Sequence, residues 1–145
     1  ADIQPLIEHL KTTYSTPELL ISTYFPEVII YFAPYGLMIK EGDTLITNHE
    51  YPSPFGGRNI PFNGQIELEK NNNEITLIKS IEVADSSIGE VFRETLGQIP
   101  DFDLRIETIY SYNESQSIIT KVRQEKYVEI NEDRQVKTLE INILD

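Results

Sequence analysis

The stretch DLRIETIYSYNESQSIITKVRQEKYVEINEDRQVKTLEINIL, residues 103–144, decides the fold class. Three runs rich in Ile, Val, Thr and Tyr alternate apolar with polar residues, which is the period-two pattern of β-strands. Turn-forming residues at 113–116 and 131–133 separate the runs. Because strands joined by such short turns pair antiparallel, we predict a three-stranded meander over 103–112, 117–130 and 134–144.

The same reasoning extends toward the N-terminus. Asn71-Asn72-Asn73 separates two further strand patterns, and Gly97 follows a helical pattern that Asp85 is placed to cap. The loop-like residues 51–64 hold three prolines and three glycines. The further strands are predicted at 28–32, 37–40, 44–49, 65–70 and 74–83, and the helices at 2–13, 16–24 and 86–96. The predicted fold class is therefore α+β: an antiparallel curled sheet or β-barrel of about eight strands, with two N-terminal helices and one helix inserted near 86–96.

Length and composition favour one globular domain over residues 1–145. A chain of 145 residues is long enough to bury one core, and no linker or low-complexity segment divides it. No apolar run approaches the roughly 20 residues that span a bilayer, and the N-terminus does not resemble a signal peptide. We expect a soluble, cytoplasmic protein that does not bind membranes, either a monomer or a homodimer.

The chain is strongly acidic, with 24 Asp and Glu against 12 Lys and Arg, a formal net charge of −12. A field of this sign repels nucleic acid and favours basic partners. We therefore expect no nucleic-acid binding, and a basic protein is one possible partner.

The chain has few residues of the two types, cysteine and histidine, that often act as nucleophiles, general bases or metal ligands. The chain has no cysteine and only two histidines, His9 and His49, which excludes thiolate and multi-histidine metal sites. His49, at a strand end beside the predicted loop, is the better candidate base, but no nucleophile motif accompanies it. Phe55-Gly56-Gly57-Arg58 lacks the strand and helix that flank a phosphate-binding loop. We expect no metal and no cofactor, and the enzyme question stays open, with the balance against catalysis.

Paired carboxylates at Glu67 and Glu69 suggest one catalytic alternative. Inside a closed barrel they would hold a divalent metal, as in acidic tunnel phosphohydrolases, provided that basic residues converge with them. The alternating apolar residues Ile66 and Leu68 instead place both glutamates outside.

Polar residues that interrupt apolar strand faces are the candidate ligand-binding residues. Alternation assigns Lys79 to the same side as Ile75, Leu77, Ile81 and Val83. By the same rule, the other candidates fall on the apolar sides of 103–112 and 117–130. These candidates are Tyr110, Gln124 and Lys126. A desolvated ammonium needs an anion or a route to solvent. If these residues line a cavity, Lys79 and Lys126 are predicted to approach one internal space; the alternative is a bulge or a strand end at which they reach solvent beyond the core.

Three functions follow from these observations. The first is a non-catalytic binding protein that holds a mostly apolar small molecule with an anionic or carbonyl end inside a β-barrel-like cavity. The second is an acidic interaction module, of the immunity-protein or chaperone kind, for a basic partner. The third is an enzyme, either an isomerase or cyclase or a metal-dependent phosphohydrolase, that uses the same cavity.

Overall fold

A computed structural model describes residues 3–13, 25–51 and 59–143 of the chain. It divides into two compact units, Ala1–Leu37 and Met38–Asp145, each of which is described by itself below. The prediction that residues 1–145 form one domain stays a prediction.

The first unit contains two helices, α1 (Gln4–Thr13) and α3 (Pro26–Phe32). The first confirms the helix predicted over 2–13, whereas the helix predicted over 16–24 lies outside the described residues. Residues 28–32 were predicted as a strand and are helical instead. Pro26 stands at the start of the helix and Glu27 in its first turn, both favourable there, and a short apolar run cannot by its periodicity distinguish a strand from a helix.

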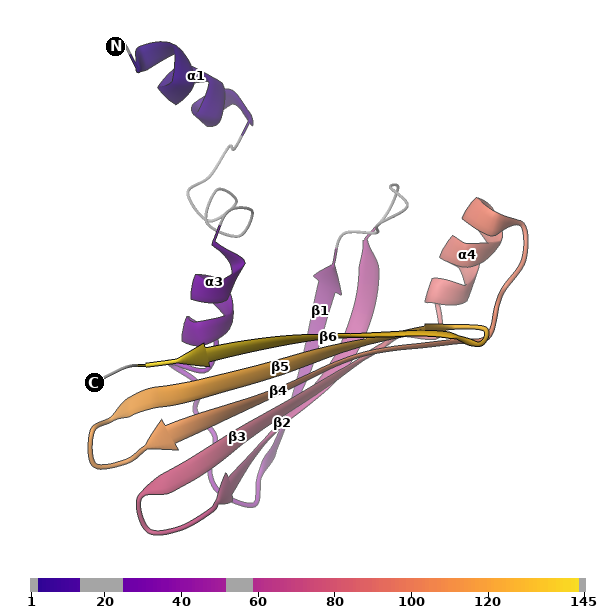
Figure 1. The fold of residues 1–145 in the computed structure, drawn as a ribbon. Coiled ribbons are helices and arrows are strands. Elements are labelled where there is room, and N and C mark those ends of the chain that lie inside the picture. The colour runs from indigo at the N-terminus through magenta and orange to yellow at the C-terminus, as the bar shows by residue number, and fades with distance from the viewer. Residues whose placement is uncertain (1–2, 14–24, 52–58, 144–145) are drawn as a thin grey trace. The chain divides into compact units, whose positions relative to one another are not determined.

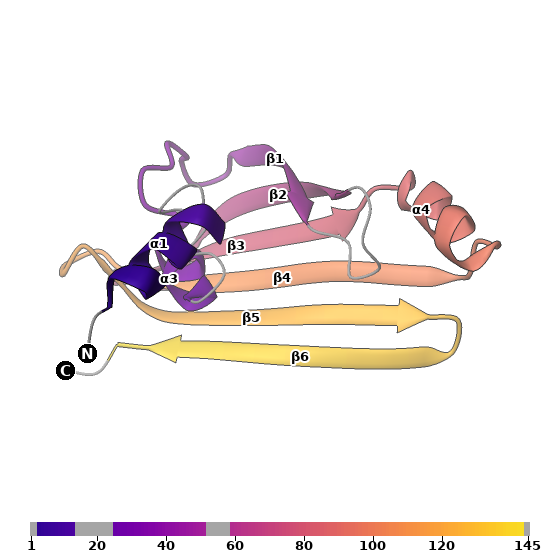
Figure 2. The same ribbon diagram turned by 90° about the horizontal axis from the view of Figure 1, so that it is seen from above.

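The second unit is a six-stranded antiparallel sheet with one helix, α4 (Ile88–Leu96) (Figure 1). Figure 2 shows the strands side by side in chain order, with α4 near the end of the sheet where β3 finishes and β4 begins. The strands are β1 (Thr44–Tyr51), β2 (Ile60–Lys70), β3 (Ile75–Ala84), β4 (Phe102–Asn113), β5 (Ile118–Ile130) and β6 (Asp133–Asn142).

The predicted fold class is confirmed, and of its two alternatives the structure has the curled sheet rather than the closed barrel. The sheet has six strands rather than about eight, because residues 28–32 are helical and residues 37–40 form no strand. It is also curled but open: β1 and β6 are edges that do not pair with each other. Of the predicted loop over 51–64, Tyr51 belongs to β1 and residues 60–64 to β2, whereas residues 52–58 lie outside the described residues.

The turns form where the sequence placed them. In the β2–β3 hairpin, the Asn72 side-chain oxygen accepts hydrogen bonds from the backbone N–H groups of Glu74 and Ile75, at 2.8 and 2.9 Å. Asn131 adopts a positive φ of 53° between β5 and β6, a conformation that Asn tolerates. Gly97 ends α4 with a φ of 76°, as the αL position of a helix C-terminus requires.

The strand register gives the sheet two faces. Residues paired across neighbouring strands share a face, and one row runs Thr47, Gly64, Glu82, Ile106, Lys126 from β1 to β5. We call the face that bears this row the inner face. The row Lys79–Ile109–Arg123, three positions along the strands, lies on the opposite face, which we call the outer face. In β3 and β4 the inner face carries the even-numbered residues.

Helix α4 packs on one end of the inner face. Its residues Ile88, Val91 and Phe92 are buried and form the core with apolar side chains of the sheet. The Phe92 ring lies 5.2 Å, centroid to centroid, from that of Phe102. The other buried core residues are Ile60, Phe62 and Ile106. Each fully buried side chain of this kind stabilises the fold by about 1.5–3 kcal/mol.

Candidate functional site

A cavity of about 490 Å³ lies between α4 and the inner face. Most of its walls are apolar side chains, and this volume suits a small organic molecule. Arg105 and Tyr127 also border it, although the register assigns their side chains to the outer face. The side chains that the helix and the inner face contribute are Tyr51, Ile60, Phe62, Ile88, Val91, Phe92, Leu104, Ile106, Lys126, Val128 and Ile130. We call this the inner cavity.

Lys126 brings a cationic group to the inner cavity, and Lys137 on β6 is its register partner on the same face. Lys126 lies opposite Ile106 in the register and its side chain is exposed, so its ammonium reaches solvent while its aliphatic stem can lie along apolar surface. Among the described residues, its ammonium forms no hydrogen bond and no ion pair. An unpaired ammonium beside an apolar cavity is suited to bind an anionic or carbonyl oxygen.

A buried carboxylate, Glu82, lies in the same row as Lys126, two strands away. The spacing of neighbouring strands places their backbones about 10 Å apart. The Glu82 side chain is 9% exposed, and its two oxygens accept hydrogen bonds from the Tyr51 hydroxyl at 2.8 Å and from His49 Nδ1 at 2.5 Å. The inner face therefore holds a buried carboxylate at one side of Ile106 and an ammonium at the other.

The Glu82 carboxylate changes the titration of two tyrosines. Burial raises the pKa of Tyr110 to about 12, and the negative charge of Glu82 adds to this effect. Burial also raises the pKa of Tyr51 far above its usual value, with further contributions from the hydrogen bond to Glu82 and from its charge. Both hydroxyls therefore stay protonated at neutral pH, and Tyr51 acts as a donor to Glu82.

The structure brings three of the four predicted site residues to one face. Lys126 lines the inner cavity. Gln124 and Tyr110 lie further along the inner face, where both are buried. The Gln124 amide donates to the Thr108 hydroxyl at 3.1 Å, so its polar group has a partner within the sheet.

Lys79 lies on the outer face, so the prediction that it shares a space with Lys126 is wrong. Its register partners are Glu67 and Ile109, and its ammonium forms an ion pair with Glu69. The prediction failed because the odd-numbered residues of β3 are the more apolar set, yet they face outward: Ile81 is 48% exposed and Val83 42%. Whether Lys79, Tyr110, Gln124 or Lys126 binds a ligand stays a prediction.

The carboxylates Glu67 and Glu69 lie on the outer face, as the sequence indicated. Because the sheet is open, these side chains face no tunnel interior. Within the described residues, no group of three or more His, Asp or Glu side chains is placed to hold a metal ion. Residues 55–58, the possible anion-binding loop, lie outside the described residues.

Sequence reasoning missed Glu82 and Gly64. Glu82 was assigned to the outward side of its strand, although His49 was noted as the better candidate base. Gly64 is the residue from which this arrangement could have been predicted, because a glycine inside a strand often marks a close approach of another group. A Cβ atom at Gly64 would lie 2.4 Å from Thr47 Oγ1 and 3.0 Å from Glu82 Cγ.

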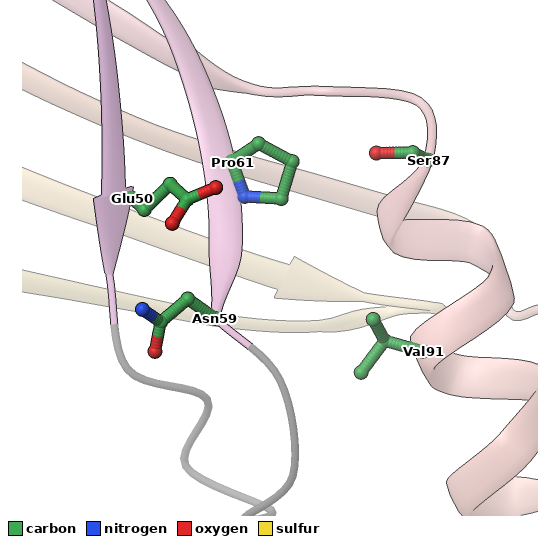
Figure 3. Close-up of a pocket in the computed structure, with 5 residues that line it drawn as sticks. All are labelled: Glu50, Asn59, Pro61, Ser87 and Val91. Atoms are coloured by element: carbon green, nitrogen blue, oxygen red, sulfur yellow. The ribbon is translucent and has the colours of Figure 1, made fainter.

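A second, smaller hollow of about 310 Å³ adjoins the start of β2. Figure 3 shows the residues that line it, Glu50 on β1, Asn59 and Pro61 at the β2 end, and Ser87 and Val91 at α4. Its one charged lining residue is a carboxylate. This hollow is therefore less suited than the inner cavity to a ligand with an anionic end.

Comparison with known proteins finds no matching family model, no matching curated sequence and no matching solved structure. In the part of the chain that the structure describes, none of the helices has the length and apolar character needed to cross a membrane.

Proposed function

We propose that this protein binds a mostly apolar small molecule in the inner cavity, with the anionic or carbonyl end of that molecule at Lys126. The observation that carries the proposal is the unpaired ammonium at the wall of an apolar cavity of about 490 Å³. Burying the ligand's chain supplies the free energy of binding, at about 25 cal/mol per Å² of apolar area. The ammonium supplies orientation and selectivity for an oxygen anion.

Calorimetric titration with decanoate and with 1-decanol tests this proposal. We expect decanoate to bind more tightly than 1-decanol, because only decanoate forms an ion pair with Lys126. In Lys126→Met the decanoate affinity should fall about tenfold or more, since a hydrogen bond between charged groups contributes about 1.5–3 kcal/mol. The affinity for 1-decanol should change little, because methionine preserves the apolar wall.

Lys79→Met is the matched control. It also removes one ammonium from the sheet, but from the outer face, where Lys79 pairs with Glu69. We expect it to leave both affinities unchanged. Equal losses of decanoate affinity in the two variants would show a general charge effect and would contradict the proposal, as would an absence of binding to the wild-type protein. Native mass spectrometry of the purified protein would show whether a small molecule is retained.

The alternative of an acidic module that binds a basic partner continues to depend on the net charge of −12, and no contact of the described residues adds to it. It stays a prediction of the sequence.

A further inference from the structure

The hydrogen bonds of Glu82 determine which nitrogen of His49 carries a proton. An ionised carboxylate only accepts hydrogen bonds, so His49 Nδ1, 2.5 Å from Glu82 Oε1, is the donor. In the neutral imidazole, Nε2 then presents its lone pair. The His49 side chain is 57% exposed, and among the described residues Nε2 forms no hydrogen bond. A carboxylate, an oriented imidazole and an accessible nitrogen form the base half of a catalytic arrangement.

The fold provides space for this carboxylate. Any residue larger than glycine at position 64 would press against Thr47 Oγ1 and Glu82 Cγ. Burying a carboxylate is costly, and an apolar residue usually fills a core position with a smaller penalty. A buried carboxylate with two hydrogen-bond donors is therefore not needed to pack the inner face, and this favours a catalytic role for Glu82 and His49.

The dyad of His49 and Glu82 adjoins the inner cavity through Tyr51. Tyr51 lines that cavity and donates to Glu82, and its ring meets the His49 ring edge to face at 6.4 Å. Lys126 lies across Ile106 from Glu82, with about 10 Å between their backbones. Neither His49 nor Glu82 lines the cavity itself, but a ligand anchored by its carboxylate at Lys126 and extended across Ile106 to Tyr51 would place its far end beside the dyad.

We propose that His49 is a general base, positioned by Glu82, that removes a proton from a carbon next to a carbonyl group at the far end of an aliphatic keto acid. This inference rests on the proposed function, because Lys126 holds the substrate. Nε2 accepts the proton, and the electron pair of the broken C–H bond moves into the carbonyl to give an enolate. The imidazolium then returns a proton to the same molecule, so that no oxidant, reductant or second substrate is consumed.

Hydrogen–deuterium exchange into 7-oxooctanoate tests the proposal with the full chain. Its carboxylate and its carbonyl are separated by an apolar chain, and the protons beside the carbonyl can be followed by ¹H NMR in D₂O. We expect the wild-type protein to accelerate exchange over buffer by about 100-fold or more, the usual contribution of a positioned base. His49→Gln should reduce the rate to that of buffer. His9→Gln, which removes the other histidine, should leave it unchanged.

Binding is measured in the same samples, by saturation transfer from the protein to the probe. A wild-type protein that does not bind 7-oxooctanoate overturns the proposed function and this inference with it. Binding without accelerated exchange overturns this inference alone. Exchange that persists in His49→Gln also overturns it, because the base would then lie elsewhere.

The role of Glu82 as a positioning residue has a readout that needs no ligand. Long-range ¹H–¹⁵N NMR spectra distinguish the two tautomers of a neutral histidine. We expect His49 to be protonated on Nδ1 in the wild-type protein and to lose this preference in Glu82→Leu, which has no acceptor, while the spectrum of His9 stays the same. Protonation of His49 on Nε2 in the wild-type protein would contradict the arrangement.

Discussion

The same strands form both faces of the sheet, but the apolar side chains of the two faces differ in how much of their surface is exposed. Apolar side chains on the inner face are buried, with Ile106 8% and Val122 0% exposed, whereas Ile109 on the outer face of the same strand β4 is 40% exposed. For Ile106 the difference comes from α4, which packs on that end of the inner face and shares its core cluster. Apolar character alone therefore does not identify the buried face of a strand; its register with neighbouring strands does.

The polar residues of the two faces differ as well. On the inner face, Gln124 bonds to Thr108, and Glu82 bonds to His49 and Tyr51. On the outer face, Lys79 and Arg123 pair with exposed carboxylates, which solvent and salt screen. The buried polar groups Glu82 and Gln124 of the inner face thus have hydrogen-bond partners within the sheet, the exposed Lys126 has none among the described residues, and the ion pairs of the outer face are weakly coupled.

The largest contrast expected between the faces is in stability. Ile106→Ala removes a buried side chain and leaves a space in the core beside α4, so it should lower the free energy of unfolding by about 2–5 kcal/mol. Ile109→Ala changes the same residue type on the same strand, but on the outer face, and should cost less than about 1 kcal/mol. Urea unfolding of both variants measures the difference. Equal costs would show that both faces are covered in solution and would contradict the comparison.

A smaller effect is expected at high pH. The pKa of Tyr110 is raised to about 12 in the folded protein, whereas an unfolded chain ionises tyrosine near pH 10. Below pH 10 both states carry the proton, so its contribution to stability is fully present there. Between pH 10 and 12 the unfolded state ionises first, and about 2 kcal/mol of stability should be lost.

Tyr110→Phe provides the comparison for this effect. Because phenylalanine has no ionisable hydroxyl, the variant should lose less stability than the wild-type protein between pH 9 and 11.5, as measured by urea unfolding at each pH. The change with pH is compared rather than the absolute stability, so any packing effect of the substitution cancels. Parallel pH profiles for the two proteins would show that Tyr110 ionises normally and is not enclosed.

Most of the second unit could be predicted from the sequence. Residues 103–144 contain clear alternation and strong turn signals, and β4, β5 and β6 form there. The helix predicted at 86–96 is present as α4, with Gly97 at its end. The failures lie in short apolar segments: residues 28–32 satisfy a strand pattern and a helix pattern equally, and only the placement of Pro26 and Glu27 favours the helix.

The candidate site was predicted only in part, and β3 explains why. Its odd-numbered residues include Ile75, Leu77, Ile81 and Val83, so alternation assigns them to the interior and assigns Glu82 to solvent. The register with β4 reverses this assignment. Sequence reasoning assumes that each strand buries its more apolar side, and it fails where the inner face carries a charged group. Lys126 does fall on the inner face, as alternation predicted, because β5 turns its more apolar side to that face.

The central claim, that a ligand occupies the inner face beside Ile106, is tested most directly by NMR with ¹³C-labelled isoleucine methyl groups. Ile106 and Ile109 belong to one strand and point to opposite faces of the sheet, so each is a control for the other. With decanoate bound, we expect nuclear Overhauser contacts from its chain to the methyl groups of Ile106 and Ile88, and none to Ile109. Contacts to Ile109, or contacts to neither face, would contradict the claim.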